Sequence, residues 1–274
     1  MELVNRLFNL TGRNIIIAGG AGQIGFAFVE ILLDAGATII IADIDTQMAE
    51  EKCDASAIAL QNKSRVFIKK ADVSDGAGLD DFYSELEKEF GTIYGLVNVF
   101  HFKGNTRKLD TSSNFFAGFE HYPEEAWDLV HDINLKGSFL MSQKALPLIE
   151  KHGKGVIVNI SSTYGLVSAN KNIYGDSGIN SPVAYATSKA ALLNLTRYMA
   201  THLADKNIRV NSLSPGGVFN NQSEEFLTNY TNLTPLKRMA VPEDYQGAIL
   251  YLMSDASSYM TGANLVVDGG WTAW

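Results

Sequence analysis

The stretch NIIIAGGAGQIG, residues 14–25, decides the fold. Its opening NIIIA is mostly apolar, as expected of a buried strand, and the glycines that follow mark a tight turn. The pattern from Gln23 to Asp34 then favours a helix. Glycines let the backbone approach a pyrophosphate closely, and a helix N-terminus offers it free N–H groups and partial positive charge. The stretch therefore predicts a dinucleotide-binding turn.

Short β-rich runs alternate with longer helical patterns along the rest of the chain. We predict strands at 14–18, 37–42, 66–69, 95–99, 155–160, 208–213 and 264–267, and helices at 23–34, 46–61, 79–90, 123–149 and 184–203. Nearly continuous apolar strands are typical of a parallel sheet that helices cover on both faces. The order of elements predicts an α/β, doubly wound parallel sheet of the Rossmann type, in a single domain over residues 1–274.

The composition bears on the partners of the protein. Acidic residues outnumber basic ones 30 to 22, which gives a net charge of −8. Nucleic acids and anionic membranes attract concentrated positive charge, so we expect neither as the main partner. Cys53 is the single cysteine, so no internal disulfide forms, and we expect no metal site. The N-terminal segment lacks the apolar core of a signal peptide, and no run reaches the roughly 18 apolar residues of a membrane helix. We therefore expect a cytoplasmic protein.

An acidic residue at the end of the second predicted strand points to the cofactor. Asp43 lies 18 residues after Gly25. Its carboxylate would accept hydrogen bonds from the adenosine ribose hydroxyls and would repel a 2′-phosphate. No Arg or Lys occupies residues 18–25 or 44–45. We therefore expect NAD rather than NADP. The alternative is a structural turn followed by a helix-capping Asp.

The sequence YATSK at 185–189 carries a candidate for proton transfer. Tyr185 and Lys189 share one face of a helix because they are four residues apart. A phenol has a pKa near ~10 and is a poor base at neutral pH, but a nearby ammonium stabilises the phenolate and lowers that pKa. Tyr185 would then take the proton of an alcohol while a hydride leaves to nicotinamide. Alone the pattern is common, and an amphipathic helix with a surface lysine is its alternative.

In combination these motifs resemble the short-chain dehydrogenase/reductase family, over nearly the whole chain and in the right order. The matching segments are the glycine turn at 18–25, ADV at 71–73, Asn98 after the fourth strand, INLKG at 133–137, NISSTYG at 159–165, YATSK at 185–189, SPGGV at 214–218 and the ending YMTGANLVVDGGW at 259–271.

The resemblance implies a role for each matched residue. Ser162 would hydrogen-bond the substrate oxygen, and Tyr185 would be the acid/base. Lys189 would hold the nicotinamide ribose and lower the pKa of Tyr185, and Asn134 would support a water that relays protons through Lys189. Ser161 is the rival for the serine role, but Ser162 stands three residues before Gly165, as the family's serine usually does. The implied cofactor contacts are Gly19, Gln23, Ile24, Gly25, Asp43, Asp72, Val73, Asn98, Tyr185, Lys189, Pro215, Gly216 and Val218.

Four departures from the family pattern affect the cofactor site. Ala18 replaces the usual Thr before the first glycine, and Gln23 replaces the middle glycine of the turn. Residues 99–101 read VFH where Asn-Ala-Gly is usual, and Asn220 stands where a Thr often follows the nicotinamide segment. The first two bear on the phosphate contacts and the third on the wall beside the nicotinamide. None removes a catalytic group.

Two long connections carry the information on the substrate. Asn98 and Asn134 are 36 residues apart, and Ser162 and Tyr185 are 23 apart, in both cases more than is usual for the family. The resulting loops, 101–122 and 166–183, follow carboxyl ends of strands, where doubly wound folds place ligands. Their polar and cationic residues favour a sugar, a sugar acid, or a phosphorylated or nucleotide-linked sugar. The alternative is that they are solvated or contact another subunit. The candidate substrate contacts are His101, Arg107, Lys108 and Tyr174.

A narrower resemblance suggests a pathway. The segments STYGLV, LTRYMA, NIRVNSLSPGGV and NNQ resemble oxidoreductases of flagellin glycosylation and legionaminic-acid-type sugar pathways. One alternative is a gluconate or polyol dehydrogenase, because the ending DGGWTAW resembles that of sugar or gluconate dehydrogenases of the family. The others are a 3-oxoacyl-carrier-protein reductase and a non-catalytic NAD-binding regulator. The family resemblance also implies a homotetramer or homodimer built through the helices at 123–149 and 184–203.

Overall fold

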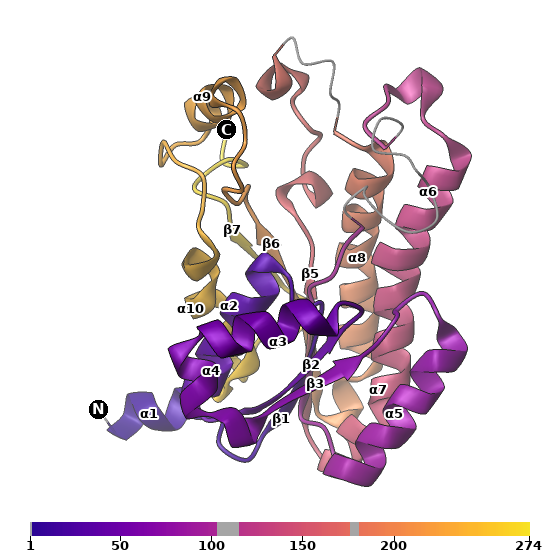
Figure 1. The fold of residues 1–274 in the computed structure, drawn as a ribbon, viewed down its shortest axis with the longest axis vertical. Coiled ribbons are helices and arrows are strands. Elements are labelled where there is room, and N and C mark those ends of the chain that lie inside the picture. The colour runs from indigo at the N-terminus through magenta and orange to yellow at the C-terminus, as the bar shows by residue number, and fades with distance from the viewer. Residues whose placement is uncertain (1, 103–114, 176–180) are drawn as a thin grey trace.

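The chain folds around one parallel β-sheet (Figure 1). The computed structural model describes residues 2–102, 115–175 and 181–274. Within them seven strands follow the order β3-β2-β1-β4-β5-β6-β7, and every neighbouring pair is parallel. The strands are β1 (Asn14–Ala18), β2 (Thr38–Asp43), β3 (Val66–Lys70), β4 (Gly95–Asn98), β5 (Gly155–Ile160), β6 (Ile208–Pro215) and β7 (Asn264–Val267). The predicted doubly wound α/β fold is confirmed.

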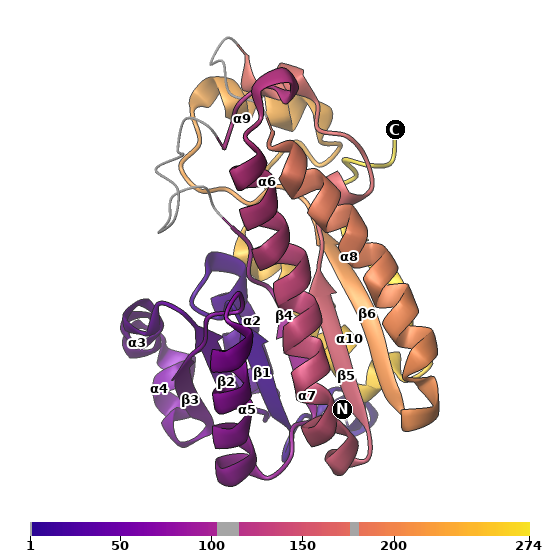
Figure 2. The same cartoon turned by 90° about the vertical axis from the view of Figure 1, so that its right-hand side faces the viewer.

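Helices cover both faces of the sheet. One side carries α2 and α10, with α3 and α4 beside them, and the other carries α5, α7 and α8 (Figures 1 and 2). The described helices are α1 (Glu2–Phe8), α2 (Gln23–Asp34), α3 (Thr46–Ala55), α4 (Ala57–Gln61), α5 (Gly76–Phe90), α6 (Glu124–His131), α7 (Ser138–His152), α8 (Val183–His202), α9 (Glu224–Leu233) and α10 (Gln246–Met253). None of them is long and apolar enough to cross a membrane.

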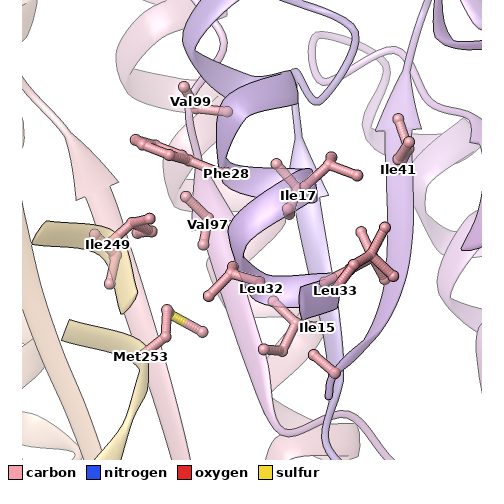
Figure 3. Packing of buried hydrophobic residues seen from close by; sticks show 14 of the residues in the cluster. Ile15, Ile17, Phe28, Leu32, Leu33, Ile41, Val97, Val99, Ile249 and Met253 are labelled. Atoms are coloured by element: carbon pink, nitrogen blue, oxygen red, sulfur yellow. The ribbon is translucent and has the colours of Figure 1, made fainter. Parts of the chain in front are cut away.

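Alternate residues of β1 explain the two helical layers. Ile15 and Ile17 pack against α2, where Leu32 lies in the same cluster (Figure 3). Ile16 points to the opposite face and belongs to the cluster of Met141 on α7. All five side chains are fully buried. Because successive side chains of a strand point to opposite faces, a run of apolar residues in β1 supplies both cores at once.

The sheet order fixes where a ligand binds. β1 pairs with β2 on one side and with β4 on the other, so the strand order reverses between β1 and β4. In a doubly wound sheet such a switch point opens a crevice at the carboxyl ends of the strands. The glycine turn after β1, the segment after β5 and the SPGGV segment at the end of β6 all lie at this edge.

The helix boundaries differ from the predicted ones in three places. The predicted helix at 46–61 is broken at Ser56, whose backbone is extended and whose hydroxyl accepts the N–H of Ala59 to cap α4. The predicted helix at 123–149 is continuous through α6 and α7, but the two are joined by a π-helical turn at Asp132–Gly137 (Figure 2). The sequence analysis missed α1, α9 and α10.

The packing of α2 gives a stability prediction. Leu32 is fully buried in the cluster shown in Figure 3, so Leu32→Ala leaves a cavity and should lower the free energy of unfolding by about 2–5 kcal/mol. Leu60 on α4 is 50% exposed, and Leu60→Ala should change it by no more than about 0.5 kcal/mol. Urea unfolding of both variants measures the difference. Equal losses would contradict the assigned core.

Candidate active site

Ser162 and Tyr185 lie together at the carboxyl edge of the sheet. Ser162 follows β5, has an extended backbone, and is 7% exposed. Its side-chain oxygen accepts the N–H of Tyr164 at 3.1 Å, and its hydroxyl is also hydrogen-bonded to Tyr185 on α8. Ser161 faces another way, because its hydroxyl donates to the carbonyl oxygen of Lys189 at 2.7 Å. The geometry therefore favours Ser162 over Ser161 as the partner of Tyr185.

Lys189 lies behind Tyr185 on the same face of α8. Its Nζ is 5.7 Å from the centre of the Tyr185 ring and donates to the carbonyl oxygen of Ile160 at 2.7 Å. The side chain is 2% exposed, and this burial lowers the pKa of Lys189 to about 7. Burial disfavours the charged ammonium, so Lys189 exchanges its proton near neutral pH.

The pKa of Tyr185 differs from the sequence expectation. We expected Lys189 to lower it below the ordinary phenol value. In the structure burial dominates and raises the pKa of Tyr185, while the hydrogen bond to Ser162 lowers it. The reason is that Lys189 directs its Nζ to the oxygen of Ile160 and is itself poorly solvated. Ser162 is thus the contact that most directly favours the phenolate.

Asn134 lies in the π-helical turn between α6 and α7 and is fully buried. Its Oδ1 accepts the N–H of Phe102 at 2.8 Å, and its Nδ2 donates to the hydroxyl of Ser188 at 3.0 Å. Ser188 precedes Lys189 on α8, so Asn134 ties the first long connection to the catalytic helix. Single π-helical turns inside α-helices are frequent at functional sites. The water relay remains a prediction.

The glycine turn after β1 is built by close backbone contacts. Gly19 has a φ of +87°, and a Cβ there would lie 2.6 Å from the nitrogen of Phe100. A Cβ on Gly25 would lie 2.2 Å from the carbonyl oxygen of Gly19. Only glycine fits at either position. Gly22 is the N-cap of α2 and provides no side-chain cap. Ile24 lies in the first turn of α2. The N-terminus of α2 therefore faces the glycine turn with its N–H groups uncapped by a side chain.

Gln23 has a contact that the sequence pattern did not show. Its Nε2 donates to the carbonyl oxygen of Phe219 at 2.9 Å. Phe219 follows the SPGGV segment, so Gln23 links the glycine turn to the end of that segment.

Asp43 joins the glycine turn to α3. Its Oδ2 accepts the N–H of Ala21 at 2.9 Å, and its Oδ1 accepts the N–H of Asp45 at 3.1 Å. Lys52 on α3 donates from Nζ to the carbonyl oxygen of Gly22 at 3.2 Å. The sequence pattern does not show this lysine, because it lies outside both the glycine turn and the residues directly after Asp43.

The remaining predicted cofactor residues have structural contacts. The Oδ1 of Asp72 accepts from the backbone N–H and the hydroxyl of Ser74, at 3.0 and 2.7 Å. Val73 contacts the π-helical turn, since a Cβ on Gly137 would lie 2.9 Å from its methyl carbon. Asn98 is 2% exposed, and its Nδ2 donates to the Oδ1 of Asn159 at 2.9 Å. The side-chain amide of Asn98 is therefore engaged in the protein interior, and its cofactor contact stays a prediction.

The SPGGV segment is held by backbone contacts. Pro215 is buried at the end of β6, and the N–H of Gly216 donates to the oxygen of Val267 at 2.9 Å. Tyr245 donates its hydroxyl to the oxygen of Gly216 at 3.1 Å. Val218 forms an isolated parallel bridge with Ala240.

An aromatic wall, made of Tyr164, Tyr174, Phe226, Tyr230 and Trp271, packs in one hydrophobic cluster. Tyr164 and Tyr174 lie near enough to Tyr185 to interact with it electrostatically. Tyr174 is hydrogen-bonded to Tyr164 and to Ser181, and its ring centre is 5.6 Å from that of Phe226. The described part of the second loop carries the predicted polar and cationic residues Asn170, Lys171 and Asn172, of which the last two are exposed. It also brings Tyr174 against α9, a helix that the sequence did not predict.

His101 lies beside the catalytic tyrosine. Its ring meets that of Tyr185 edge-on, with ring centres 6.0 Å apart. The candidates Arg107 and Lys108 lie outside the residues that the structure describes. Among the described residues, no group of three or more His, Cys, Asp or Glu side chains is arranged to hold a metal ion.

Comparison with known proteins identifies the family. A family model described as enoyl-(acyl carrier protein) reductase matches residues 19–272. A short-chain dehydrogenase from Leptospira borgpetersenii, crystallised with bound NAD+, superposes with a TM-score of 0.83 at 35% identity, over 96% of this chain and 94% of that one. The chain belongs to the short-chain dehydrogenase/reductase family. As a member, it is an oxidoreductase that acts on CH–OH groups with a pyridine nucleotide.

Other members of the family with similar sequences differ in substrate. The NAD-dependent glycerol dehydrogenase of Listeria innocua is 30% identical over 97% of this chain and 96% of its own length. The post-translational flagellin modification protein A of Campylobacter coli is 29% identical over 96% and 99%. A gluconate 5-dehydrogenase from Burkholderia cenocepacia, in complex with NADP and tartrate, has a TM-score of 0.84 at 26% identity, over 99% of both chains.

The buried lysine gives a prediction on pH dependence. The pKa of Lys189 is about 7 in the folded protein, against 10.5 as the ordinary value. Between these values the unfolded chain binds a proton that the folded chain does not, so this residue makes stability rise with pH from about 7 upward. Lys189→Met should reduce the slope of unfolding free energy against pH by up to about 1.4 kcal/mol per pH unit.

Urea unfolding at pH 7, 8 and 9 measures this slope, below the range where tyrosines ionise. The control is Lys88→Met, on the exposed face of α5, which should keep the slope of the unmodified protein. Parallel curves for the unmodified protein and Lys189→Met would show that the lysine is not desolvated as described.

Proposed function

We propose that this protein interconverts a secondary alcohol and a ketone on an uncharged polyhydroxylated substrate, a sugar or a polyol, with NAD as the hydride carrier. The observation that carries the proposal is the hydrogen bond between Ser162 and Tyr185, with Lys189 buried behind them at the carboxyl edge of the sheet. A proton acceptor, a hydrogen-bond donor and a proton-exchanging amine are thus gathered at one point.

The residues of the chain fit a dinucleotide. The uncapped N-terminus of α2 and the close glycine turn suit a pyrophosphate, and Asp43 suits an adenosine ribose. The nicotinamide half would lie against the segment 214–218 and Lys189. When bound, this group supplies or accepts the hydride at the reacting carbon.

The chain's own residues handle the proton. In alcohol oxidation Tyr185 accepts the proton of the substrate hydroxyl, and Ser162 holds the substrate oxygen by a hydrogen bond. Ser162 also stabilises the phenolate form of Tyr185. Lys189, with a pKa of about 7, passes the proton onward. Asn134 holds α8, the helix that carries Tyr185 and Lys189, through its hydrogen bond to Ser188. In ketone reduction the same groups act in reverse.

Asp43 supports NAD over NADP. Its carboxylate joins the glycine turn to α3, where a 2′-phosphate would meet its negative charge. Lys52 is the opposing influence, since its ammonium binds the same turn. We give Asp43 the greater weight because Lys52 is already engaged with the oxygen of Gly22.

The aromatic wall supports a polyhydroxylated substrate. Its half-buried members Tyr164, Tyr174 and Phe226 would offer ring faces to C–H groups and phenol hydroxyls to substrate hydroxyls. None of the five members of the wall carries a charge at neutral pH. His101 adds a second polar group beside Tyr185. The similarity to the glycerol dehydrogenase of Listeria innocua agrees with this class.

A second candidate is oxidation or reduction of a sugar or nucleotide-linked sugar in glycan biosynthesis. The similarity to the flagellin modification protein of Campylobacter coli favours it.

We further propose that the protein is cytoplasmic and forms a homotetramer or homodimer. The oligomer is suggested by Phe139 on α7 and Tyr198 on α8, which are 44% and 65% exposed. Light scattering would reject the oligomer if it gave the monomer mass of 29.9 kDa.

The catalytic assignment is tested by Tyr185→Phe. We expect kcat/KM to fall by about 10²–10⁴-fold while NADH affinity stays within about threefold, because only the proton-transfer group is lost. The assay is NAD-linked turnover of a panel of polyols, sugar acids, nucleotide sugars and an acetoacetyl thioester, with NADH binding followed by fluorescence. Tyr259→Phe, at a fully exposed position, is the matched control.

The outcome of the panel separates the candidates. Turnover of polyols supports the first proposal, and turnover restricted to nucleotide sugars supports the second. Full activity of Tyr185→Phe would overturn the proposed role of the phenol.

The cofactor assignment is tested by Asp43→Asn. The unmodified protein should bind NADH more tightly than NADPH, and the variant should lose about tenfold or more of that preference because the charge facing a 2′-phosphate is gone. Fluorescence titration with both nucleotides measures it. Asp34→Asn, at the end of α2, serves as the control for charge removal away from the turn. A preference for NADPH in the unmodified protein would show that Lys52, not Asp43, decides the specificity.

A further inference from the structure

Tyr230 of α9 contacts the backbone of the SPGGV segment from behind. The N–H of Gly217 donates to its hydroxyl oxygen at 2.6 Å, and the side chain is 5% exposed. A Cβ on Gly217 would lie 2.7 Å from both the ring carbon Cζ and the hydroxyl oxygen of Tyr230. The ring is therefore pressed directly against this glycine, and its hydroxyl fixes the direction of the amide.

The same ring belongs to the aromatic wall. Tyr230 stacks on Phe226, one turn earlier in α9, with ring centres 5.8 Å apart and planes 20° from parallel. Phe226 in turn meets Tyr174, which is hydrogen-bonded to Tyr164. A continuous set of ring contacts thus joins the second long loop to Gly217.

A third set of contacts prevents the ring from moving away. Trp271 stacks on Tyr230 with ring centres 4.3 Å apart and planes 16° from parallel. The turn that carries Trp271 is held by Asp268, whose Oδ1 accepts the N–H of Gly270 and whose Oδ2 accepts both the N–H and the hydroxyl of Thr272. Tyr230 is consequently clamped between the C-terminal turn and the segment at the end of β6.

We infer that Tyr230 is a positioning residue for the segment 214–218. It holds Gly217, so the packing of α9 within the aromatic wall sets where this segment lies relative to Tyr185. The inference rests on the proposed function, because the role of that segment in holding nicotinamide is part of it. Substrate packing against the wall then acts on the geometry of hydride transfer without touching the cofactor. Hydride transfer is sensitive to small displacements, so loss of one such contact has a measurable effect on rate.

The test is Tyr230→Phe, which keeps the ring contacts and removes the acceptor of the Gly217 amide. The control is Tyr83→Phe, because the Tyr83 hydroxyl is also buried and donates to the oxygen of Met141 at 2.8 Å, on the α5–α7 side of the sheet. Both variants lose one buried hydrogen bond, so we expect similar decreases in melting temperature. Only Tyr230→Phe should lower kcat, by about tenfold, and raise KM for the nicotinamide cofactor several-fold.

Two further readouts separate positioning from general stability. With NADH dideuterated at C4, the isotope effect on kcat should be larger in Tyr230→Phe than in the unmodified protein and unchanged in Tyr83→Phe, because hydride transfer becomes slower. Hydrogen exchange of a peptide covering residues 214–218 should be faster in Tyr230→Phe alone, a result that requires no turnover.

Unchanged kinetics, isotope effect and exchange in Tyr230→Phe would overturn the inference, as would an equal kinetic loss in Tyr83→Phe. Failure of the proposed function is distinguishable, since the unmodified protein would then bind no NADH, and the positioning role would fall with it. If the unmodified protein binds NADH and turns substrate over while Tyr230→Phe matches it, only the inference fails.

Discussion

The hydrogen bond from the Nζ of Lys189 to the carbonyl oxygen of Ile160 fixes the active site to the sheet. Ile160 is the last residue of β5, and Lys189 lies one turn beyond Tyr185 on α8. A strand end and a helix are thereby held in one register, and Ser161 strengthens the same junction by donating to the main-chain oxygen of Lys189. The contact between Ser162 and Tyr185 follows from this register, because neighbouring residues of the same two elements supply it.

A buried polar network surrounds this junction. The Nδ2 of Asn98 donates to Asn159 and to Ser142, and Asn159 donates to Thr196 of α8. These contacts join β4, β5, α7 and α8 through the protein interior. Asn98 Oδ1 is the member without a hydrogen-bond partner among the described residues. The network therefore orients α7 and α8 relative to the two central strands.

The sequence predicted most of the sheet because both faces of β1, β4 and β5 are buried and their residues are accordingly apolar. The candidate catalytic residues Ser162, Tyr185 and Lys189 could also be found from the sequence, since they stand in short local motifs. Contacts between distant segments were not predictable in the same way. Lys52 reaches the glycine turn from a helix 30 positions further along the chain, and only the packing of α3 reveals it.

The aromatic wall and the pKa of Tyr185 were missed for a similar reason. The wall draws its residues from three separate segments, and no one of them shows a pattern that predicts a shared surface. The sequence spacing of Tyr185 and Lys189 gives their common helix face, but not that the ammonium turns to Ile160 and loses its solvation. Charge effects depend on burial, which a motif does not specify.

The π-helical turn at Asp132–Gly137 limits how this helix can change in length. Each residue added to or removed from an α-helix rotates everything beyond it by about 100°. Deleting one residue from the turn would regularise the rod formed by α6 and α7, but it would rotate one side relative to the other. Either Asn134 would leave Phe102 and Ser188, or Met141 of α7 would turn away from the sheet. The number of residues between Asn134 and Met141 is therefore fixed by contacts on both sides of the turn.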